Sequence, residues 1–470
     1  MIPGKNLYDR APVWMQTIAA NLLSARNFHR KYGQQFHKSL ARLERNEKRT
    51  LEEMMERQSR ALRDLLAYAV RHVPYYRERQ FSPDCLEEWP ILDKQTVAAS
   101  PQQFLSDQFY AQSLMSLHTS GTTGSPLNVR FTNAYHQIEM AFRWRHKAWA
   151  GVPFLSSCAY ISGHPIVPVH QQKPPFWRFD RMEKRMLCSS YHLAPQHIPA
   201  YIEAIAGFSP DFVHGYPSSL YVLAQHMLAS TGPKVRPKAV FSASETLLDF
   251  QRPVIEEAFA APLFNWYGNS EMTCNIVQCA AGSLHYRMDY GFLELLPDGT
   301  MICTGLNNLA MPLIRYRVGD QAAMGGGTCP CGCAFPTMQR LEGRSEDYVR
   351  TPDGRFVGRL DHIFKDVHHV REAQIVQERL DEVILRIQRT DGFTPEEEQI
   401  ILNEARQRLG RNVKIRFSYV DSIARSANGK FRFIVSRLPV EQREVVPASG
   451  STLAQPASPP PLVSQPRTFD

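Results

Sequence analysis

The chain has no run of about 18 apolar residues anywhere in its 470 residues, so no membrane-spanning helix is expected. The first residues, MIPGKNLYDRAPVW, lack a basic start followed by an apolar core, so we expect no secretory signal. The nine cysteines show no spacing typical of a small disulfide scaffold. Reduced thiols or metal ligation in a cytoplasmic protein fit this count better than disulfides do.

The composition also lacks an excess of either charge that would point to one macromolecular partner. The formal charge of +8 is spread along the chain, with 43% hydrophobic and 21% charged residues, as in an ordinary globular enzyme. Such a charge suits an anionic small molecule such as a nucleotide, and we expect no nucleic-acid partner. No Ser-His-Asp set and no paired-carboxylate hydrolase arrangement stands out in the sequence.

Hydrophobic periodicity divides the chain. Residues 35–80 carry apolar positions at helical spacing and predict one or two amphipathic helices that end near Val73-Pro74. From about 85 to 340, strand-like runs alternate with helix-like stretches, which predicts an α/β domain with mostly parallel strands. The expected strands of this part are Cys158–Ile161, Asp211–His214, Ala239–Ser242, Leu263–Trp266, Phe292–Leu296, Met301–Thr304 and Leu313–Tyr316.

A smaller unit follows. Strands over Ala373–Gln377, Glu382–Gln388 and Val413–Tyr419, with a helix over Pro395–Leu409, predict a compact α+β domain. We therefore expect a large domain over 1–345 with a helical lead-in over about 1–80, and a small domain over 346–440. Residues 441–470 are rich in proline, serine and alanine, so they are expected to be a disordered tail.

The string LHTSGTTGSPLNVR at 117–130 is the strongest motif. Its glycines permit a close approach of the backbone to a ligand, and its N–H and hydroxyl groups can bind an anion. No Lys-Ser or Lys-Thr follows the glycines, so this is not a Walker A loop. Read alone, it could equally be a polar surface loop.

Four later strings favour the ligand-binding interpretation of this loop. Phe241–Glu245 ends an expected strand with small residues that leave room for a flat ring. Trp266–Glu271 combines an aromatic ring, a hydroxyl and a carboxylate suited to Mg²⁺. Arg315–Asp320 places an acid after a glycine turn, where it could accept both ribose hydroxyls, and Ser426–Lys430 presents a lysine on a glycine turn.

In this order the five strings resemble the motifs of the adenylate-forming superfamily, and within it the phenylacetate–CoA ligase branch with its CapK and coenzyme F390 synthetase relatives. The strings VPYYR, HGYPSS at 214–219 and GRSED at 343–347 add to the likeness, which spans about residues 35–440. The resemblance implies an α/β fold in which a large N-terminal domain of several sheets carries a small, mobile α+β C-terminal domain.

The resemblance also implies an activity. A carboxylic acid would react with ATP, with Mg²⁺ present, to give an acyl-adenylate, and an acyl acceptor would then displace AMP. Coenzyme A is the expected acceptor, and an aromatic acid is the suggested substrate. An amine acceptor, adenylyl transfer to a hydroxyl, and a nucleotide-binding scaffold without catalysis are the alternatives. The sequence does not decide between a monomer and a dimer.

Roles for individual residues follow from the resemblance alone. The loop would hold the β- and γ-phosphates, Tyr267 would flank adenine, Ser270 would touch the α-phosphate, Glu271 would help to bind Mg²⁺ and Asp320 would take the ribose. The remaining implied nucleotide contacts are Ser120, Gly121, Thr122, Thr123, Gly124, Glu245, Gly268 and Arg344. The implied lining of the acyl pocket is His214 and Tyr216.

Lys430 would bridge the carboxylate and the α-phosphate from the small domain, which would rotate after adenylation about a hinge at Glu346-Asp347. Two departures from the family pattern affect this part of the chain. The string ARSANGKFRF lacks the proline before the arginine and the threonine after it that many relatives carry, and Glu346 replaces a more usual aspartate.

Cysteine and histidine spacing indicates a second, structural site. Cys279 and His285 lie close in sequence, and Cys329 and Cys331 follow in the string TCPCGCAFP. Together they would form a closed tetrahedral Cys₃His zinc site, with Cys333 able to replace either neighbouring cysteine. Free buried thiols and a surface histidine are the alternative.

Overall fold

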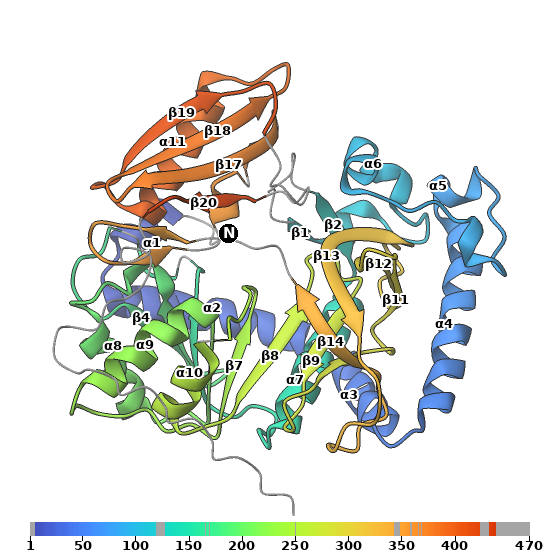
Figure 1. The fold of residues 1–470 in the computed structure, drawn as a ribbon, viewed down its shortest axis with the longest axis horizontal. Helices are drawn as coiled ribbons and strands as arrows, with labels where there is room; N and C mark the ends of the chain where they lie inside the picture. Colours follow the sequence, from blue (N-terminus) through green and yellow to red (C-terminus); the bar gives the residue numbers. More distant parts are fainter. Residues whose placement is uncertain are drawn as a thin grey trace, which may run out of the picture.

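The computed structural model describes residues 5–118, 127–164, 166–168, 170–249, 251–342, 348–357, 360–364, 366–367, 369–423 and 432–438. A large body built on one sheet carries a smaller four-stranded body, which lies above it in Figure 1. This is the α/β architecture expected from the sequence. None of the helices within the described ranges is long and apolar enough to cross a membrane.

The large sheet has 12 strands in the order β11-β12-β13-β14-β10-β9-β8-β7-β6-β3-β5-β4. Its parallel part consists of β3 (Cys158–Ser162), β5 (Arg185–Ser189), β6 (Phe212–Gly215), β7 (Ala239–Ala243) and β8 (Leu263–Gly268). All five residues of β7 are buried. A strand covered on both faces reads as a continuous apolar run. The sequence located β3, β6, β7 and β8 to within a residue or two, whereas β5 was not predicted.

The remaining strands of this sheet pair antiparallel, so the expectation of mostly parallel strands holds only for the centre. They are β4 (Trp177–Asp180), β9 (Asn275–Gln278), β10 (Leu284–Tyr286), β11 (Gly291–Leu295), β12 (Thr300–Gly305), β13 (Tyr316–Met324) and β14 (Thr337–Glu342). The strand expected over Leu313–Tyr316 was placed too early, because β13 begins at Tyr316. Leu313 and Ile314 are buried in the core ahead of it.

Helices cover both faces of the parallel strands. In Figure 1, α8 (Ile198–Phe208), α9 (Pro217–Ala229) and α10 (Gln251–Phe259) lie in front, and α2 (Val13–Lys31), α3 (Gln34–Asn46) and α7 (Asn133–Trp149) lie behind. Each face has its own apolar cluster. The ends of the parallel strands therefore lie between two helical layers, which is where ligands bind in open α/β sheets.

Helix α4 (Leu51–His72) packs on the antiparallel part of the sheet. Thr50 accepts a hydrogen bond from the amide of Glu53, whose carboxylate accepts one from the amide of Thr50, and this capping box fixes the start of the helix. The helix ends at His72, directly before Val73-Pro74, as expected. The short helix α5 (Pro74–Arg77) follows.

The small body is a four-stranded sheet in the order β19-β18-β17-β20 with helix α11 (Pro395–Leu409). Its strands are β17 (Val370–Arg379), β18 (Glu382–Arg389), β19 (Lys414–Tyr419) and β20 (Ile434–Ser436). A separate apolar cluster forms its core. Arg355, beside the hairpin β15 (Val349–Arg350) and β16 (Phe356–Val357), joins it to the large body by donating to the Tyr191 carbonyl at 3.0 Å. The expected hinge at Glu346-Asp347 lies outside the described residues.

Candidate functional site

The glycine-rich loop itself lies outside the described residues, and with it Ser120, Gly121, Thr122, Thr123 and Gly124. The strands on either side of it are described. β1 (Met115–His118) pairs antiparallel with β2 (Asn128–Phe131), and His118 lies opposite Asn128. The two ends of the loop therefore leave and re-enter one hairpin, as a ligand-binding loop on a rigid support requires.

At the end of β8, the Tyr267 hydroxyl donates a hydrogen bond of 2.6 Å to the Asp320 carboxylate on β13. Burial, followed by the neighbouring Asp320 charge, raises the pKa of Tyr267 well above its ordinary value. Tyr267 is thus a neutral donor at physiological pH. The backbone of this residue is fixed as well, because its carbonyl accepts from the Asn275 side chain at 2.8 Å.

A second link joins the same two parts of the sequence. The Tyr316 hydroxyl, at the start of β13, donates to the Glu271 carboxylate at 3.0 Å. Glu271 and Ser270 are half-buried neighbours in the turn that follows β8. Tyr316 belongs to the same sequence string as Asp320, but the sequence suggested no role for it, because only the folded chain brings it to Glu271.

The turn that carries Glu271 is held by its own side chains and by two glycines. The Asn269 amide group accepts from the Thr273 backbone N–H at 2.9 Å and donates to the Thr273 hydroxyl at 2.6 Å. A Cβ on Gly291 would lie 2.1 Å from the Thr273 carbonyl oxygen, and one on Gly305 would lie 2.7 Å from that of Met272. The turn therefore rests directly on the backbones of β11 and β12.

Glu245 follows β7 and contacts two other elements. Its Oε2 accepts from the Ser218 backbone N–H at the start of α9 (3.3 Å) and from the Tyr348 hydroxyl (3.2 Å). Tyr348 is the first described residue after the expected hinge, so this carboxylate bridges the large body and the start of the small one. The sequence gave no signal for Tyr348.

His214 and Tyr216 are brought next to the ends of β3 and β6. The His214 ring lies 5.0 Å from that of Tyr160 and 6.5 Å from that of Phe241, measured between centroids. Burial lowers the pKa of His214 well below its ordinary value, so its imidazole is neutral at physiological pH. The Tyr216 hydroxyl accepts from the Gly163 amide at 3.2 Å. Gly268 ends β8, whereas Arg344 and Lys430 lie outside the described residues.

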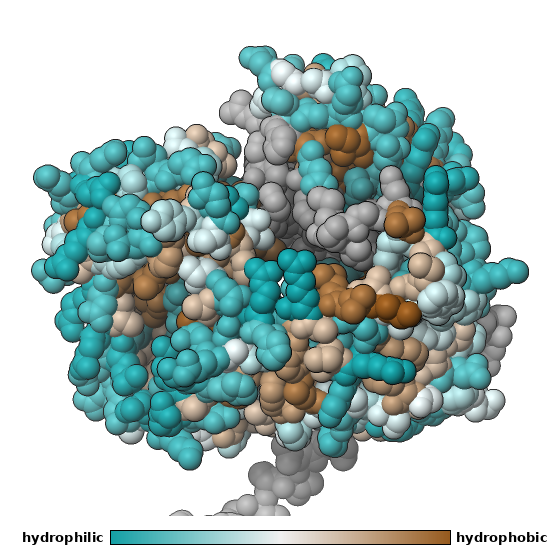
Figure 2. Space-filling view, turned by 180° about the vertical axis from the view of Figure 1, so that it is seen from behind, coloured by the Kyte–Doolittle hydropathy of each residue, from teal (hydrophilic) through white to brown (hydrophobic). Residues whose placement is uncertain are grey.

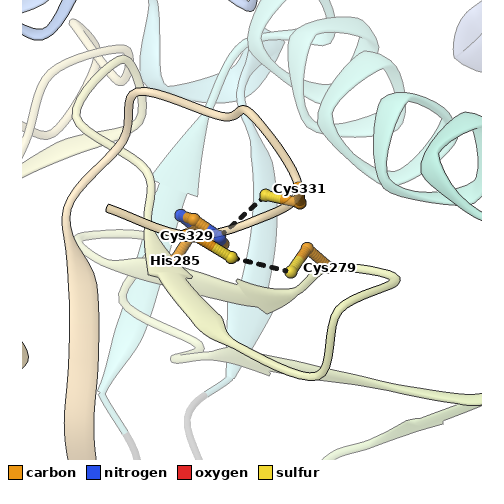
Figure 3. Close-up of side chains that lie close together, drawn as sticks. All are labelled: Cys279, His285, Cys329 and Cys331. Atoms are coloured by element: carbon orange, nitrogen blue, oxygen red, sulfur yellow. Dashed lines mark hydrogen bonds between the residues drawn. The ribbon is translucent and has the colours of Figure 1, made fainter. Parts of the chain in front are cut away.

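All four expected zinc ligands meet in one place (Figure 3). One ligand atom from each of Cys279, His285, Cys329 and Cys331 lies within 4.8 Å of the other three. The Cys279 and Cys329 sulfurs are 3.7 Å apart, and Cys331 Sγ lies 3.4 Å from His285 Nε2. Tetrahedral zinc with Zn–S bonds of about 2.3 Å requires sulfur separations of about 3.8 Å, so the group fits this ion.

The surroundings of the four side chains support metal binding. His285 Nδ1 lies 2.8 Å from the Phe335 carbonyl, which directs Nε2 toward the cysteines. Burial acts to raise the pKa of Cys329, but hydrogen bonds from Ser283 and Cys331 outweigh it and lower the value to about 6. The thiolate is the form that binds metal. The Cys333 amide donates to Cys331 Sγ at 3.4 Å, and the Cys333 side chain is not among the four grouped ligands.

Comparisons with known proteins agree on the fold. Residues 349–437 match the CapK C-terminal domain family. Protein CapK of Staphylococcus aureus is 24% identical over 459 residues, covering 92% of this chain and 99% of the relative. A crystal structure of 2-hydroxyisobutyryl-CoA ligase with 2-HIB-AMP and CoA in the thioesterification state superposes with a TM-score of 0.53 at 18% identity, covering 84% of this chain and 92% of the ligase.

The same ligase in the postadenylation state with R3-HIB-AMP gives a TM-score of 0.50 at 18% identity, covering 83% of this chain and 91% of that one. At these identities the likeness concerns the fold. It agrees with the architecture that the five sequence strings implied.

Proposed function

We propose that the chain is a member of the adenylate-forming superfamily, as its likeness to CapK and to the ligase fold supports, and that it uses ATP to activate a carboxylic acid as an acyl-adenylate. A carboxylate oxygen attacks the α-phosphorus of ATP, the bond to the bridging oxygen breaks and pyrophosphate leaves. In the second step a thiol, that of coenzyme A, attacks the acyl carbon and AMP leaves with the electron pair of the broken C–O bond. Both steps use one nucleotide site.

The observation that carries this proposal is the double link between β8 and β13. Tyr267 contacts Asp320, and Glu271, four residues after Tyr267, contacts Tyr316, four residues before Asp320. Each of the two acids is thus hydrogen-bonded to the tyrosine of the other acid's string, Asp320 to Tyr267 and Glu271 to Tyr316. An adenosine with its phosphates needs such a pair, since one acid serves the ribose and the other serves the metal.

In this proposal Asp320 accepts the ribose hydroxyls, Tyr267 flanks adenine and Glu271 helps to hold the magnesium. Bound Mg²⁺ would supply charge that offsets the charge developing on the phosphates. Ser270 donates to the α-phosphate. Contacts to the remaining phosphates are assigned to the glycine-rich loop, and Lys430 is assigned to the reacting carboxylate.

We also propose a structural zinc ion held by Cys279, His285, Cys329 and Cys331. Three thiolates and one imidazole complete a tetrahedron and leave no open position, which is typical of a structural rather than a catalytic site. The ion would tie the loop before β14 to the β9–β10 turn, on strands continuous with the one that carries Tyr267.

A substrate screen tests the reaction. Purified protein, ATP and Mg²⁺ are incubated with aromatic, fatty, hydroxy and amino acids, and hydroxamate formation and pyrophosphate release are measured with and without coenzyme A. We expect acid-dependent hydroxamate, and AMP release that rises with coenzyme A. A turnover rate that coenzyme A does not change but that added amines increase would instead identify an amine acceptor. ATP binding without turnover of any acid would contradict the proposal.

A further inference from the structure

Helix α2 turns its apolar side chains outward. Five large apolar residues lie along its solvent side, and together they are called here the α2 face: Trp14, Met15, Ile18, Leu22 and Leu23, which are 64%, 46%, 51%, 67% and 37% exposed. Leu7 on α1 (Lys5–Arg10) is 79% exposed. Figure 2 shows hydrophobic side chains gathered across the middle of this side of the molecule, where α2 crosses behind the sheet.

The inward side of the same helix is small and polar, since its buried residues are Gln16, Ala20 and Ser24. Polar contacts hold it against strand β4: Arg178 donates to the Gln16 side chain at 3.0 Å, and the Asn21 side chain donates to the Phe179 carbonyl at 2.7 Å. In a typical amphipathic helix the apolar side chains face the protein and the polar ones face solvent, and α2 has the opposite arrangement.

The apolar patch is confined to the helices. Phe179 on β4, the strand against which α2 packs, is 40% exposed, but its ring lies 5.7 Å from that of Phe208 on α8, on the other face of the sheet. An exposed apolar patch such as the α2 face marks an interaction surface. It lies at the β4 edge of the 12-stranded sheet, whereas the two candidate nucleotide acids belong to β13 and to the turn after β8.

The charged residues of α2 itself are all basic. Residues 10–43 contain six Lys or Arg and no Asp or Glu. Arg26 and Arg30 are exposed on the last turns of α2, next to the apolar part, while Lys31 is paired with Glu183 at 2.6 Å. A second copy of α2 would bring like charges together, because the helix itself contains Arg26, Arg30 and Lys31 and no acid. An anionic surface pairs them and also accepts the apolar side chains.

We propose that α1 and α2 dock the protein onto an anionic lipid surface. Helix α2 would lie in the plane of the interface, with the α2 face at the boundary between headgroups and acyl chains. Trp14 would sit at headgroup depth, where indole rings are favoured, and Arg26 and Arg30 would contact lipid phosphates. Such docking requires no membrane-spanning helix, in agreement with the absence of one from the described ranges.

Vesicle flotation of the full chain tests the docking. Vesicles of phosphatidylcholine alone are compared with vesicles that also contain phosphatidylglycerol. We expect binding to the anionic vesicles only, weakened by salt. Trp14→Ser with Ile18→Ser should reduce this binding by about 100-fold, since each side chain contributes apolar transfer free energy. Arg26→Gln and Arg30→Gln should each reduce it about fivefold.

Leu51→Ser with Met55→Ser is the matched control. Both residues are exposed apolar side chains of another helix, α4, at 41% and 54% exposure. This pair should leave binding unchanged, and circular dichroism checks that every variant is folded. Quenching of tryptophan fluorescence by brominated lipid should occur in the wild type and be lost in Trp14→Phe.

Three outcomes would overturn the proposal. One is flotation that does not exceed the phosphatidylcholine level. Another is equal loss of binding in the α2 and α4 variants. The third is a dimer in solution that Trp14→Ser with Ile18→Ser dissociates without any vesicle binding, which would assign the α2 face to a second copy of the chain.

Discussion

The Tyr267 hydroxyl and the Asp320 carboxylate lie 2.6 Å apart, with the phenol as donor, although 53 residues separate them in the chain. The hydrogen bond orients the carboxylate of Asp320. Because the pKa of Tyr267 is raised by burial and by the nearby carboxylate, the contact persists across the physiological pH range. The nucleotide assignment can be tested at this pair of residues.

Asp320→Asn should weaken ATP binding by about 10- to 100-fold, because a hydrogen bond to a charged group contributes roughly 1.5–3 kcal/mol. Tyr267→Phe should weaken it only about fivefold, since the carboxylate remains. Isothermal titration with a non-hydrolysable ATP analogue measures both effects. If Asp320→Asn binds the analogue as tightly as the wild type does, Asp320 is not the ribose acceptor.

Glu271→Gln should lower the rate of acyl-adenylate formation by about 100-fold and raise the Mg²⁺ concentration needed for half-maximal rate, because a metal ligand loses its charge. Tyr316→Phe removes the 3.0 Å hydrogen bond to Glu271 but leaves its charge. This variant should shift the Mg²⁺ requirement in the same direction by a smaller factor. A rate loss in Glu271→Gln at an unchanged Mg²⁺ requirement would remove Glu271 from the metal site.

Lys430→Ala should reduce pyrophosphate exchange about 100-fold while leaving the transfer of preformed acyl-adenylate to coenzyme A within about fivefold of the wild type. Lys414→Ala is the control in the same small domain, because Lys414 is 73% exposed on β19. Equal losses in the two half-reactions would contradict a role limited to adenylation.

Metal analysis should find about one zinc ion per chain. Cys279→Ser and Cys331→Ser should lose the metal and lower Tm by roughly 5 °C or more, since about 1 kcal/mol shifts the Tm of a large domain by about 2–4 °C. Cys333→Ser should keep the metal and the wild-type Tm, because the Cys333 side chain is not among the four grouped ligands. Zinc retained in Cys331→Ser but lost in Cys333→Ser would show that Cys333, and not Cys331, coordinates the ion.

Stability should fall as the pH drops from 7 to 5. Burial lowers the pKa of His146 to about 3, whereas a histidine in an unfolded chain titrates near 6.5. The unfolded state therefore binds more protons in this window, and His146 alone costs about 2 kcal/mol of stability by pH 5. His136, with a pKa lowered by burial to about 4, adds to the effect in the same direction.

His146→Gln should reduce this pH dependence by about a third, because His136 and His214, whose pKa values burial also lowers, act in the same direction. Urea unfolding at pH 7 and pH 5 would measure the change. His29→Gln, on the exposed side of α2, is the control and should not change it. An unaltered slope in His146→Gln would place the acid sensitivity elsewhere in the chain.

The sequence predicted four of the five central strands, β3, β6, β7 and β8, and the clearest of them is β7, which is buried along its whole length. It also grouped Cys279, His285, Cys329 and Cys331 correctly, since metal ligands come in short pairs whose spacing is visible in the chain. Helix α11 was predicted with the bounds that the structure gives it.

Other features depend on contacts that have no local signal. The contacts of Glu271 with Tyr316 and of Glu245 with Tyr348 join residues 45 and 103 positions apart. Helix α2 lies within the helical lead-in expected over about 1–80, but its bounds were not predicted, because its large apolar residues face outward and its pattern does not resemble that of a core helix. Its reversed pattern is the feature that suggested a lipid surface.

Gly291 and Gly305 carry no reactive group, yet they allow the turn that holds Glu271 to pack closely on the backbones of β11 and β12. A methyl group at either position would meet a carbonyl oxygen of that turn at 2.1 or 2.7 Å and lift it from β11 and β12. Substitutions in this part of the chain must therefore keep these two positions without a side chain. An alanine at Gly291 or Gly305 would displace Glu271 even though none of the polar residues of the site had been changed.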